Sequence, residues 1–464
     1  MHLGKATHQM SIDQMELPLD VRGAAPSVSR SDEAESARQG HERSGLDDVR
    51  LMEQVVEAGN LARALKRVRG NKGSPGVDGL TVNELPAYLR THWPAIREQL
   101  LAARYQPTVV KRVEIVKPDG GVRQLGIPTV LDRFIQQAVL QVLQSMIDPT
   151  FSEYSFGFRP GRSAHDAVRQ AQRYVKEGRG WVVDVDLAQF FDRVNHDILM
   201  GLLAKRIGDP RVLTLIRSYL EAGVMVTVVV LERREGTPQG GPLSPMLANV
   251  LLDVADRELE RRGHAFVRYA DDGNVYVRSR RAAERVMESL EGLYAGLKLT
   301  INRDKSAVAP AGARTFLGFR LWEVIRGRIV HRRLVAPKAM EKLKARVREL
   351  TSRSRGWSLS AVVKALRRYL LGWKAYFGLA ETPSTFGKID GWIRRRLRLL
   401  IVIQCKRGTT LFRKLRARGL GIRDAAGAAA YCRRWWMTAA SPALNMAFPP
   451  RYFDEIGVPR LGPS

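Results

Sequence analysis

The chain has 464 residues, 45% of them hydrophobic, and 76 Lys and Arg against 47 Asp and Glu give it a formal net charge of +29. This length suits two or three folded domains, and the charge predicts a polyanionic partner, either nucleic acid or an anionic membrane. Its apolar runs are shorter than the ~20 residues of a membrane-spanning helix, which argues against membrane spanning, and its N-terminus has no signal-peptide core, which argues against secretion. Its two cysteines form no CxxC pair, which argues against a disulfide framework and a Cys-rich zinc site.

The predicted elements begin after residues 1–45, which are rich in Ser, Glu, Arg and Gly and are expected to be a disordered tail. From there to about residue 330, helical and strand periodicities alternate, which indicates a folded α+β body. We expect its helices over 48–68, 82–104, 131–147, 196–206, 246–262 and 281–296. We expect its strands and hairpins over 109–127, 181–186, 223–233 and 265–279, with Gly-rich loops at 70–79 and 236–245.

The chain changes character near residue 331. Residues 331–420 hold 24 Lys and Arg against 4 Asp and Glu, which predicts a folded phosphate-binding module. Apolar residues recur at helical spacing from Met340 to Leu350 and from Val362 to Trp373. A third helix is expected over 390–402, with four arginines opposite its apolar side: Arg394, Arg395, Arg396 and Arg398.

Two groups of aspartates are candidates for metal chemistry. In the second hairpin, strand-forming residues flank Asp271-Asp272-Gly273-Asn274, which we interpret as the turn, so two carboxylates would lie side by side at a strand tip. Upstream, Asp184 and Asp186 share one face of an apolar strand, where a carboxylate is costly unless it is paired or metal-bound. Taken alone, the hairpin pair is better explained by ordinary turn chemistry. The strand carboxylates could equally form a structural salt bridge or a helix cap.

Six motifs in a fixed order resemble the reverse transcriptases of bacterial group II introns, which combine a polymerase with a maturase. They are Arg123–Thr129 (RQLGIPT), Phe156–Pro160 (FGFRP), Asp186–Asp192 (DLAQFFD), Pro238–Pro245 (PQGGPLSP), Tyr269–Asp272 (YADD) and Phe316–Phe319 (FLGF). In the basic part, Tyr369–Phe377 and Trp392–Leu397 carry the resemblance further.

The resemblance implies a right-hand polymerase, with fingers and an antiparallel-sheet palm over 46–330. An α-helical thumb or maturase domain would follow over 331–424, and 425–464 would be a short C-terminal segment, the candidate for a rudimentary DNA-binding region. The implied function is RNA-directed DNA polymerisation by a protein that binds its own intron RNA, assists its splicing and copies it at a DNA target. Because the Cys pairs of the family's zinc-bound nuclease are missing, we expect no second-strand cleavage, and we expect a bacterial, cytoplasmic, nucleoid-associated protein.

The resemblance also assigns residues. Asp186, Asp271 and Asp272 would hold two Mg2+ ions. The dNTP pocket would comprise the sugar-gate ring of Phe191, the loop residues Gln239 and Gly240, the triphosphate clamp Lys117 and Arg123, and the motif lysine Lys305. The four clustered arginines of 394–398 would bind RNA, which arginine suits because it forks to phosphate and stacks on bases. For Phe316 and Phe319, a primer grip and simple packing both remain open.

Two other functions remain open from the sequence. A related reverse transcriptase could serve phage defence or template-directed diversification, although such chains typically lack a matching maturase domain. A non-catalytic RNA-binding splicing factor is the other alternative, and the three intact aspartates argue against it.

Overall fold

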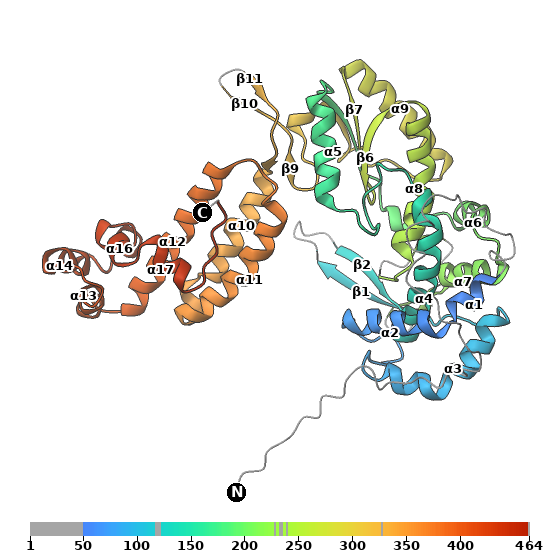
Figure 1. The fold of residues 1–464 in the computed structure, drawn as a ribbon, viewed down its shortest axis with the longest axis horizontal. Coiled ribbons are helices and arrows are strands. Elements are labelled where there is room, and N and C mark those ends of the chain that lie inside the picture. Colours follow the sequence, from blue (N-terminus) through green and yellow to red (C-terminus); the bar gives the residue numbers. More distant parts are fainter. Residues whose placement is uncertain are drawn as a thin grey trace, which may run out of the picture.

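The computed structural model describes residues 50–462 except 117–121, 227–228, 232–234, 238–239 and 326–327. The predicted N-terminal tail, Lys117 and Gln239 lie outside the described residues. Within them, a mixed body of helices and sheets is followed by a helical module at the opposite end of the molecule (Figure 1).

The first part of the body is helical around one small sheet. The predicted helix over 48–68 is two helices, because Glu57 adopts extended backbone between them. The helices are α1 (Leu51–Val55), α2 (Ala58–Gly70), α3 (Leu85–Leu101) and α4 (Val130–Ile147). The sheet has the order β2-β1-β4-β5 and consists of β1 (Val110–Val116), β2 (Val122–Ile127), β4 (Val224–Val226) and β5 (Val229–Leu231).

The second part is built on an antiparallel sheet of order β6-β7-β3-β8. Its strands are β3 (Trp181–Val185), β6 (Ala265–Tyr269), β7 (Asp272–Val277) and β8 (Ala307–Pro310). The helices packed against it are α5 (Ala164–Lys176), α8 (Ser244–Arg261) and α9 (Arg280–Gly296). Helix α6 (His196–Ala204) packs on α8, and α7 (Pro210–Glu221) packs on α6. The sequence analysis had not predicted α5 and α7.

Both faces of this sheet are buried, and strand alternation decides which residue faces which core. Val183 and Val275 join the core shared with α4 and α8, whereas Val182 and Tyr276 join a second core against α5. Asp184 and Asp272 follow the parity of Val182 and Tyr276, so they lie on the α5 face at the end of the sheet. The alternation therefore brings carboxylates from different strands to one face.

Short strands lead from the body into the helical module. They are β9 (Phe319–Arg320), β10 (Glu323–Ile325), β11 (Arg328–Val330) and β12 (Leu334–Val335). The first helices of the module are α10 (Pro337–Leu350), α11 (Leu359–Phe377) and α12 (Pro383–Cys405). They are followed by α13 (Gly408–Arg416), α14 (Ile422–Ala430), α15 (Trp435–Thr438), α16 (Pro442–Ala447) and α17 (Pro450–Glu455).

One hydrophobic core runs through the whole module. Leu343 of α10 and Leu366 of α11 belong to the same cluster of buried residues as Leu444, Phe448 and Phe453 near the C-terminus. The segment 425–462 is therefore packed into the module's core rather than appended to it. No helix among the described residues is long and apolar enough to cross a membrane.

Candidate active site and nucleic-acid surface

Three strands bring the predicted catalytic aspartates to one edge of the palm sheet. Asp186 directly follows β3, and Asp271 and Asp272 lie where β6 turns into β7. Since Val185 pairs with Gly273, the chain leaves β3 beside the start of β7. The Asp186 backbone is fixed there, because its N–H donates to the Ser306 hydroxyl at 2.9 Å.

The hairpin turn lies earlier than the sequence suggested. Tyr269 pairs with Asp272, so Ala270 and Asp271 form the two-residue turn, whereas Gly273 and Asn274 are inside β7. The prediction that 271–274 forms the turn was therefore wrong by about two residues. Ala270 adopts a left-handed φ of +59°, which is uncommon for a residue with a Cβ. The altered register places Asp271 at the tip and Asp272 on the first position of the strand.

The carboxylates at this edge are crowded. Burial, together with the nearby charges of Asp184, Asp271 and Asp186 and against the opposing charge of Arg314, raises the pKa of Asp272 to about 7. Asp184 has a partner of its own, because Arg314 Nε donates to its carboxylate at 2.6 Å. The salt bridge considered for the strand carboxylates thus belongs to Asp184. The other three form a negative cluster that a cation would stabilise.

Asp186 currently faces a lysine. Lys305 Nζ lies 3.7 Å from its Oδ1, and both side chains are exposed to solvent. Among the described residues, no three His, Cys, Asp or Glu side chains are close enough to form a ready-made metal-binding group. The donor set still fits Mg2+, which prefers carboxylate oxygens and commonly takes only one or two of them, with water and substrate phosphates completing its shell.

A cavity of about 560 Å3 brings together residues of the predicted nucleotide pocket. Phe191 and Gly240 both line it, next to Leu125 of β2. Gly240 has a φ of +140°, and a Cβ there would lie 2.4 Å from the Gly126 carbonyl oxygen, so only glycine allows this loop to approach β2. Phe190, by contrast, is a core residue. The side chains of Lys117, Arg123 and Gln239 lie outside the described residues.

The cavity also contains cations that the sequence analysis missed. Arg67 of α2 and Arg133 of α4 line it, and an adjoining cavity of about 810 Å3 adds Arg63 and Lys66. Residues 63, 66 and 67 are spaced so that they share one helix face, and this spacing could have predicted the cluster of cations. The apolar periodicity that predicted the helix did not reveal it. This basic, open surface borders the Gly-rich loop at 70–79.

The arginine cluster of α12 does not lie on one exposed face. Arg394 and Arg398 are only 4% and 6% exposed, so the prediction that all four arginines oppose the apolar side was wrong. Arg394 pairs with Asp454 at 2.7 Å, and Arg398 Nε donates to the Phe448 carbonyl at 2.9 Å. These two residues tie the C-terminal segment to α12 and are covered in this conformation.

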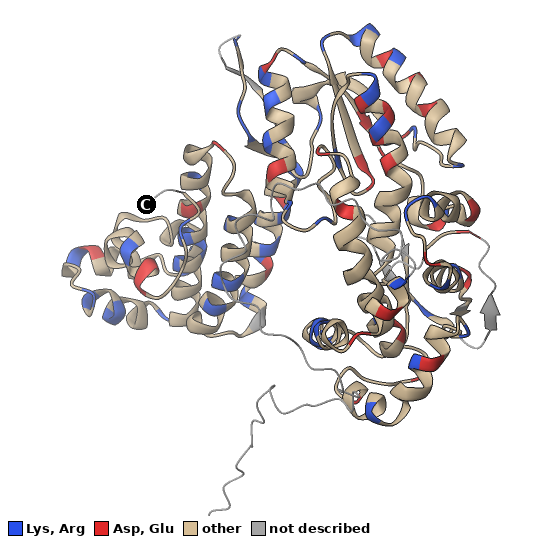
Figure 2. Cartoon of the chain, turned by 45° about the vertical axis from the view of Figure 1, so that its right-hand side comes forward, with Lys and Arg blue, Asp and Glu red and all other residues tan. Residues whose placement is uncertain are grey.

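The other two arginines border a basic and aromatic cavity of about 540 Å3. Arg396 lines it, and Arg395 lies over the ring of Trp436 at 3.9 Å. Trp435 and Trp436 are about two-fifths exposed. The cavity is lined by four arginines, two tryptophans and no acidic residue: Arg348, Thr351, Ser352, Arg353, Arg396, Leu399, Ile403, Arg434, Trp435, Trp436 and Met437. Lys and Arg also outnumber Asp and Glu across the helices of the module (Figure 2).

Phe316 and Phe319 connect the palm to the helical module by packing. Both rings are buried, and Phe319 contacts Phe377 of α11 at a centroid distance of 5.3 Å. The Tyr376 hydroxyl donates to the Leu317 carbonyl at 2.9 Å. Of the two readings left open for this motif, the structure supports packing at the junction.

Comparisons with known proteins match both parts of the chain. Residues 115–321 match the family described as reverse transcriptase (RNA-dependent DNA polymerase), and residues 340–419 match the maturase-specific domain of group II introns. The protein YkfC of Escherichia coli (strain K12) is 33% identical over 345 residues, which cover 65% of this chain and 90% of YkfC.

Other relatives share only part of their length with this chain. The group II intron-encoded protein LtrA of Lactococcus lactis subsp. cremoris is 34% identical over 218 residues, which cover 46% of this chain and 36% of LtrA. A solved chain of a partial Cas6-RT-Cas1–Cas2 complex is 27% identical, with 53% of this chain and 42% of that chain covered. Its TM-score of 0.35 is too low to support a structural argument.

Proposed function

The chain belongs to the group II intron reverse transcriptase and maturase family, and from this premise we propose that it copies its own intron RNA into DNA and assists the splicing of that RNA. The observation that carries the polymerase half is the convergence of Asp186, Asp271 and Asp272 at one sheet edge. The basic and aromatic cavity of the helical module supports the RNA-binding half.

In this proposal Asp186, Asp271 and Asp272 hold two Mg2+ ions. When bound, these ions activate the primer 3′-hydroxyl and stabilise the leaving pyrophosphate. The protein's contribution is to fix three carboxylates at the tip of a rigid sheet, where their mutual repulsion favours cation binding. For this, Asp186 must exchange its contact with Lys305 for one with the metal, which leaves the Lys305 ammonium free near the reacting phosphates.

The cavity beside this edge accepts the incoming dNTP. The Phe191 ring lines it and would lie against carbon 2 of the sugar, where it leaves no room for a 2′-hydroxyl. Gly240 allows the loop backbone to approach the nascent base pair, and Arg67 and Arg133 supply positive charge for the template or the phosphates. The template is RNA, and the primer is a DNA strand.

Primer extension on an RNA template, with Mg2+ and dNTPs, tests the polymerase half. Wild-type protein should extend the primer and Asp271→Asn should not, because the turn carboxylate is lost while its shape is kept. Asp184→Asn is the matched control, since Asp184 is a carboxylate at the same end of the sheet but has Arg314 as its partner. Wild-type protein that extends no primer would refute the polymerase and leave the non-catalytic RNA-binding reading.

Sequencing of the RNA that copurifies with the protein tests the intron half. One dominant folded RNA that contains the protein's own coding sequence would support the maturase. A mixed population, or an unrelated small RNA, would instead favour a reverse transcriptase recruited for defence or diversification.

A further inference from the structure

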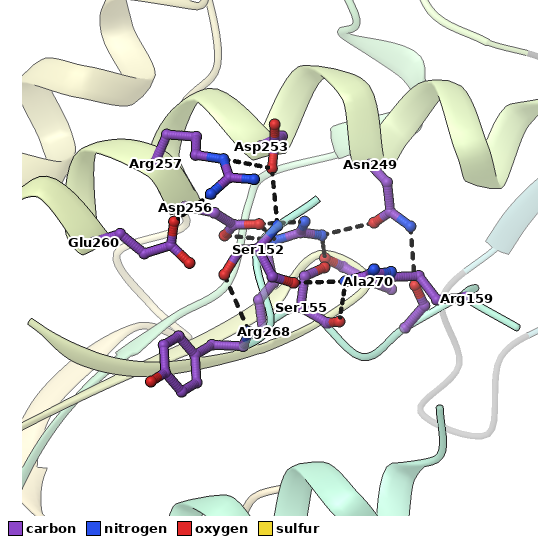
Figure 3. Close-up of polar contacts among 12 residues, drawn as sticks. Ser152, Ser155, Arg159, Asn249, Asp253, Asp256, Arg257, Glu260, Arg268 and Ala270 are labelled. Carbon is purple, nitrogen blue, oxygen red and sulfur yellow. Dashed lines mark hydrogen bonds and ion pairs between the residues drawn. The ribbon is translucent and has the colours of Figure 1, made fainter. Parts of the chain in front are cut away.

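The turn that carries Asp271 is held from two sides by groups outside the catalytic triad. Figure 3 shows the Arg268 side, with its contacts to Asp256, Asn249 and Ala270. On one side is the guanidinium of Arg268, one strand position before Tyr269. On the other is the backbone of Gly157, in the Phe156–Pro160 motif that the proposed function leaves without a role. Between them, Ala270 keeps its left-handed φ of +59°.

Arg268 spans the distance from α8 to the turn. Its side chain is buried, and its Nε lies 2.9 Å from both carboxylate oxygens of Asp256. Its Nη1 donates to the Asn249 side-chain oxygen at 2.8 Å and to the Ala270 carbonyl at 2.9 Å. Asp256 and Asn249 both belong to α8, the helix that begins at the proposed nucleotide loop. Arg268 thus connects that helix with the catalytic turn.

Gly157 closes the other side. A Cβ at this position would lie 2.1 Å from the Ala270 nitrogen and 2.8 Å from the Tyr269 carbonyl carbon. Only a glycine lets the two backbones approach so closely. The Asn249 amide donates to the Gly157 carbonyl at 2.9 Å, so the same α8 side chain fixes both the glycine and Arg268.

A buried ion pair that made no further hydrogen bond could be replaced by well-packed apolar side chains at little cost in stability. The Arg268 pair has a further task, because its remaining N–H holds the carbonyl of a residue in a sparsely populated backbone conformation. Such conformations persist where the surroundings over-determine them, and they occur at functional sites. These contacts therefore maintain the backbone conformation of the turn.

We propose that Arg268, Asn249, Asp256 and Gly157 form a turn clamp that holds Ala270 left-handed and so aims the Asp271 carboxylate at the metal site. The four are positioning residues, and the inference rests on the proposed polymerase function. Without the clamp the turn relaxes, and Asp271 spends less time where a metal ion and the primer terminus meet.

The first test is Arg268→Lys, which keeps the positive charge beside Asp256 but cannot reach Asp256, Asn249 and the Ala270 carbonyl together. We expect kcat for primer extension to fall about 30-fold, with KM for dNTP nearly unchanged, because orientation rather than binding is lost. Arg159→Lys is the matched control. Arg159 is also a buried arginine, but it binds Asp148 and the carbonyls of Ser152 and Ser155 rather than the turn.

The second test is suppression. Glycine adopts the left-handed conformation without strain, so Ala270→Gly removes the need to hold the turn. The double variant Arg268→Lys/Ala270→Gly should recover about tenfold of the lost kcat, although the buried ion pair is still impaired. Ala270→Gly should give no recovery in the Arg159→Lys background.

The third readout does not depend on activity. Mn2+ titration followed by electron paramagnetic resonance should show weaker binding to Arg268→Lys than to Arg159→Lys, and Ala270→Gly should restore it. Equal kcat and equal Mn2+ affinity in the two lysine variants, or no recovery with Ala270→Gly, would overturn the clamp. Failure of the polymerase itself is distinguishable, because then the wild-type protein extends no primer while the order of Mn2+ affinities still tests the clamp.

Discussion

The palm edge and helix α12 of the module use charge in opposite ways. At the palm edge, three aspartates crowd together, and the cation beside Asp186 is the solvent-exposed Lys305. In α12, the inward-facing Arg394 is neutralised by Asp454 inside the protein. The comparison shows that the number of charges in a segment does not say whether they face a ligand. What decides this is whether the fold supplies a partner.

The largest expected effect tests the palm side of this comparison. Asp186→Asn should lower kcat for primer extension by roughly 1000-fold, because it removes a proposed ligand of the catalytic metals. Arg314 already neutralises Asp184, so Asp184→Asn should retain most of the activity if the variant folds. Steady-state primer extension measures both. Equal losses of kcat in the two variants would mean that the ion pair with Arg314 does not separate Asp184 from the catalytic role of Asp186.

The next effect tests the module side, by stability. Arg394→Ala removes a buried guanidinium that binds Asp454 and the Asp390 carbonyl, while Arg460 still pairs with Asp454, and it should lower the free energy of unfolding by about 2 kcal/mol. Arg395→Ala, on the exposed ring of Trp436, should cost about 0.5 kcal/mol. Urea denaturation followed by circular dichroism measures the difference. A similarly small loss of stability in both variants would mean that Arg394 contributes no more to folding than an exposed arginine.

Much of the palm could be predicted from the sequence, because its chemistry is confined to short motifs. The strand before Asp186 and the hairpin around Asp271 were identified by alternation, although the turn was misplaced. Asp-Gly is a strong turn signal, but here pairing of Tyr269 with Asp272 and the clamp at Ala270 decide the register. Local turn preference was overridden by contacts from α8 and from residue 157, which no local pattern reveals.

The module was harder to predict for a related reason. Composition identified it as basic and helical, but the inward side of α12 depends on what packs against it. Arg394 and Arg398 are four residues apart and thus share a face, and this face meets Phe448, Phe453 and Asp454 of the C-terminal segment. Because these partners lie some 50 residues downstream in the chain, a face of α12 that the sequence predicts to bind RNA is instead part of the module's core.

A smaller effect tests whether the basic and aromatic cavity of the module binds RNA. Trp435→Ala should weaken RNA binding about tenfold, because an unpaired base would lose a stacking surface in the module's cavity. Met446→Ala, which removes an exposed apolar side chain on α16 outside this cavity, is the control. Filter binding with the copurified RNA measures both. An unchanged affinity for Trp435→Ala would exclude the cavity as a contact site.

The smallest expected effect concerns pH and follows from the unneutralised palm edge. In the metal-free protein the pKa of Asp272 is about 7, above its ordinary value of about 3.9, so the folded state keeps a proton that the unfolded state releases between these values. The resulting stability is present at low pH and is lost as pH rises through 7. In EDTA, the Tm of the wild-type protein should therefore fall about 3 °C more between pH 5 and pH 8 than the Tm of Asp272→Asn.

Added Mg2+ should reverse this loss in the wild-type protein at pH 8, because a bound cation favours the ionised carboxylate. It should have little effect on Asp272→Asn, where the repulsion is already reduced. Differential scanning fluorimetry at both pH values measures the four conditions. The same pH dependence of Tm in both proteins would mean that Asp272 is already ionised without metal. The charges of the palm edge would then be better compensated within the protein than their crowding indicates, and in this respect the edge would resemble the internally paired module.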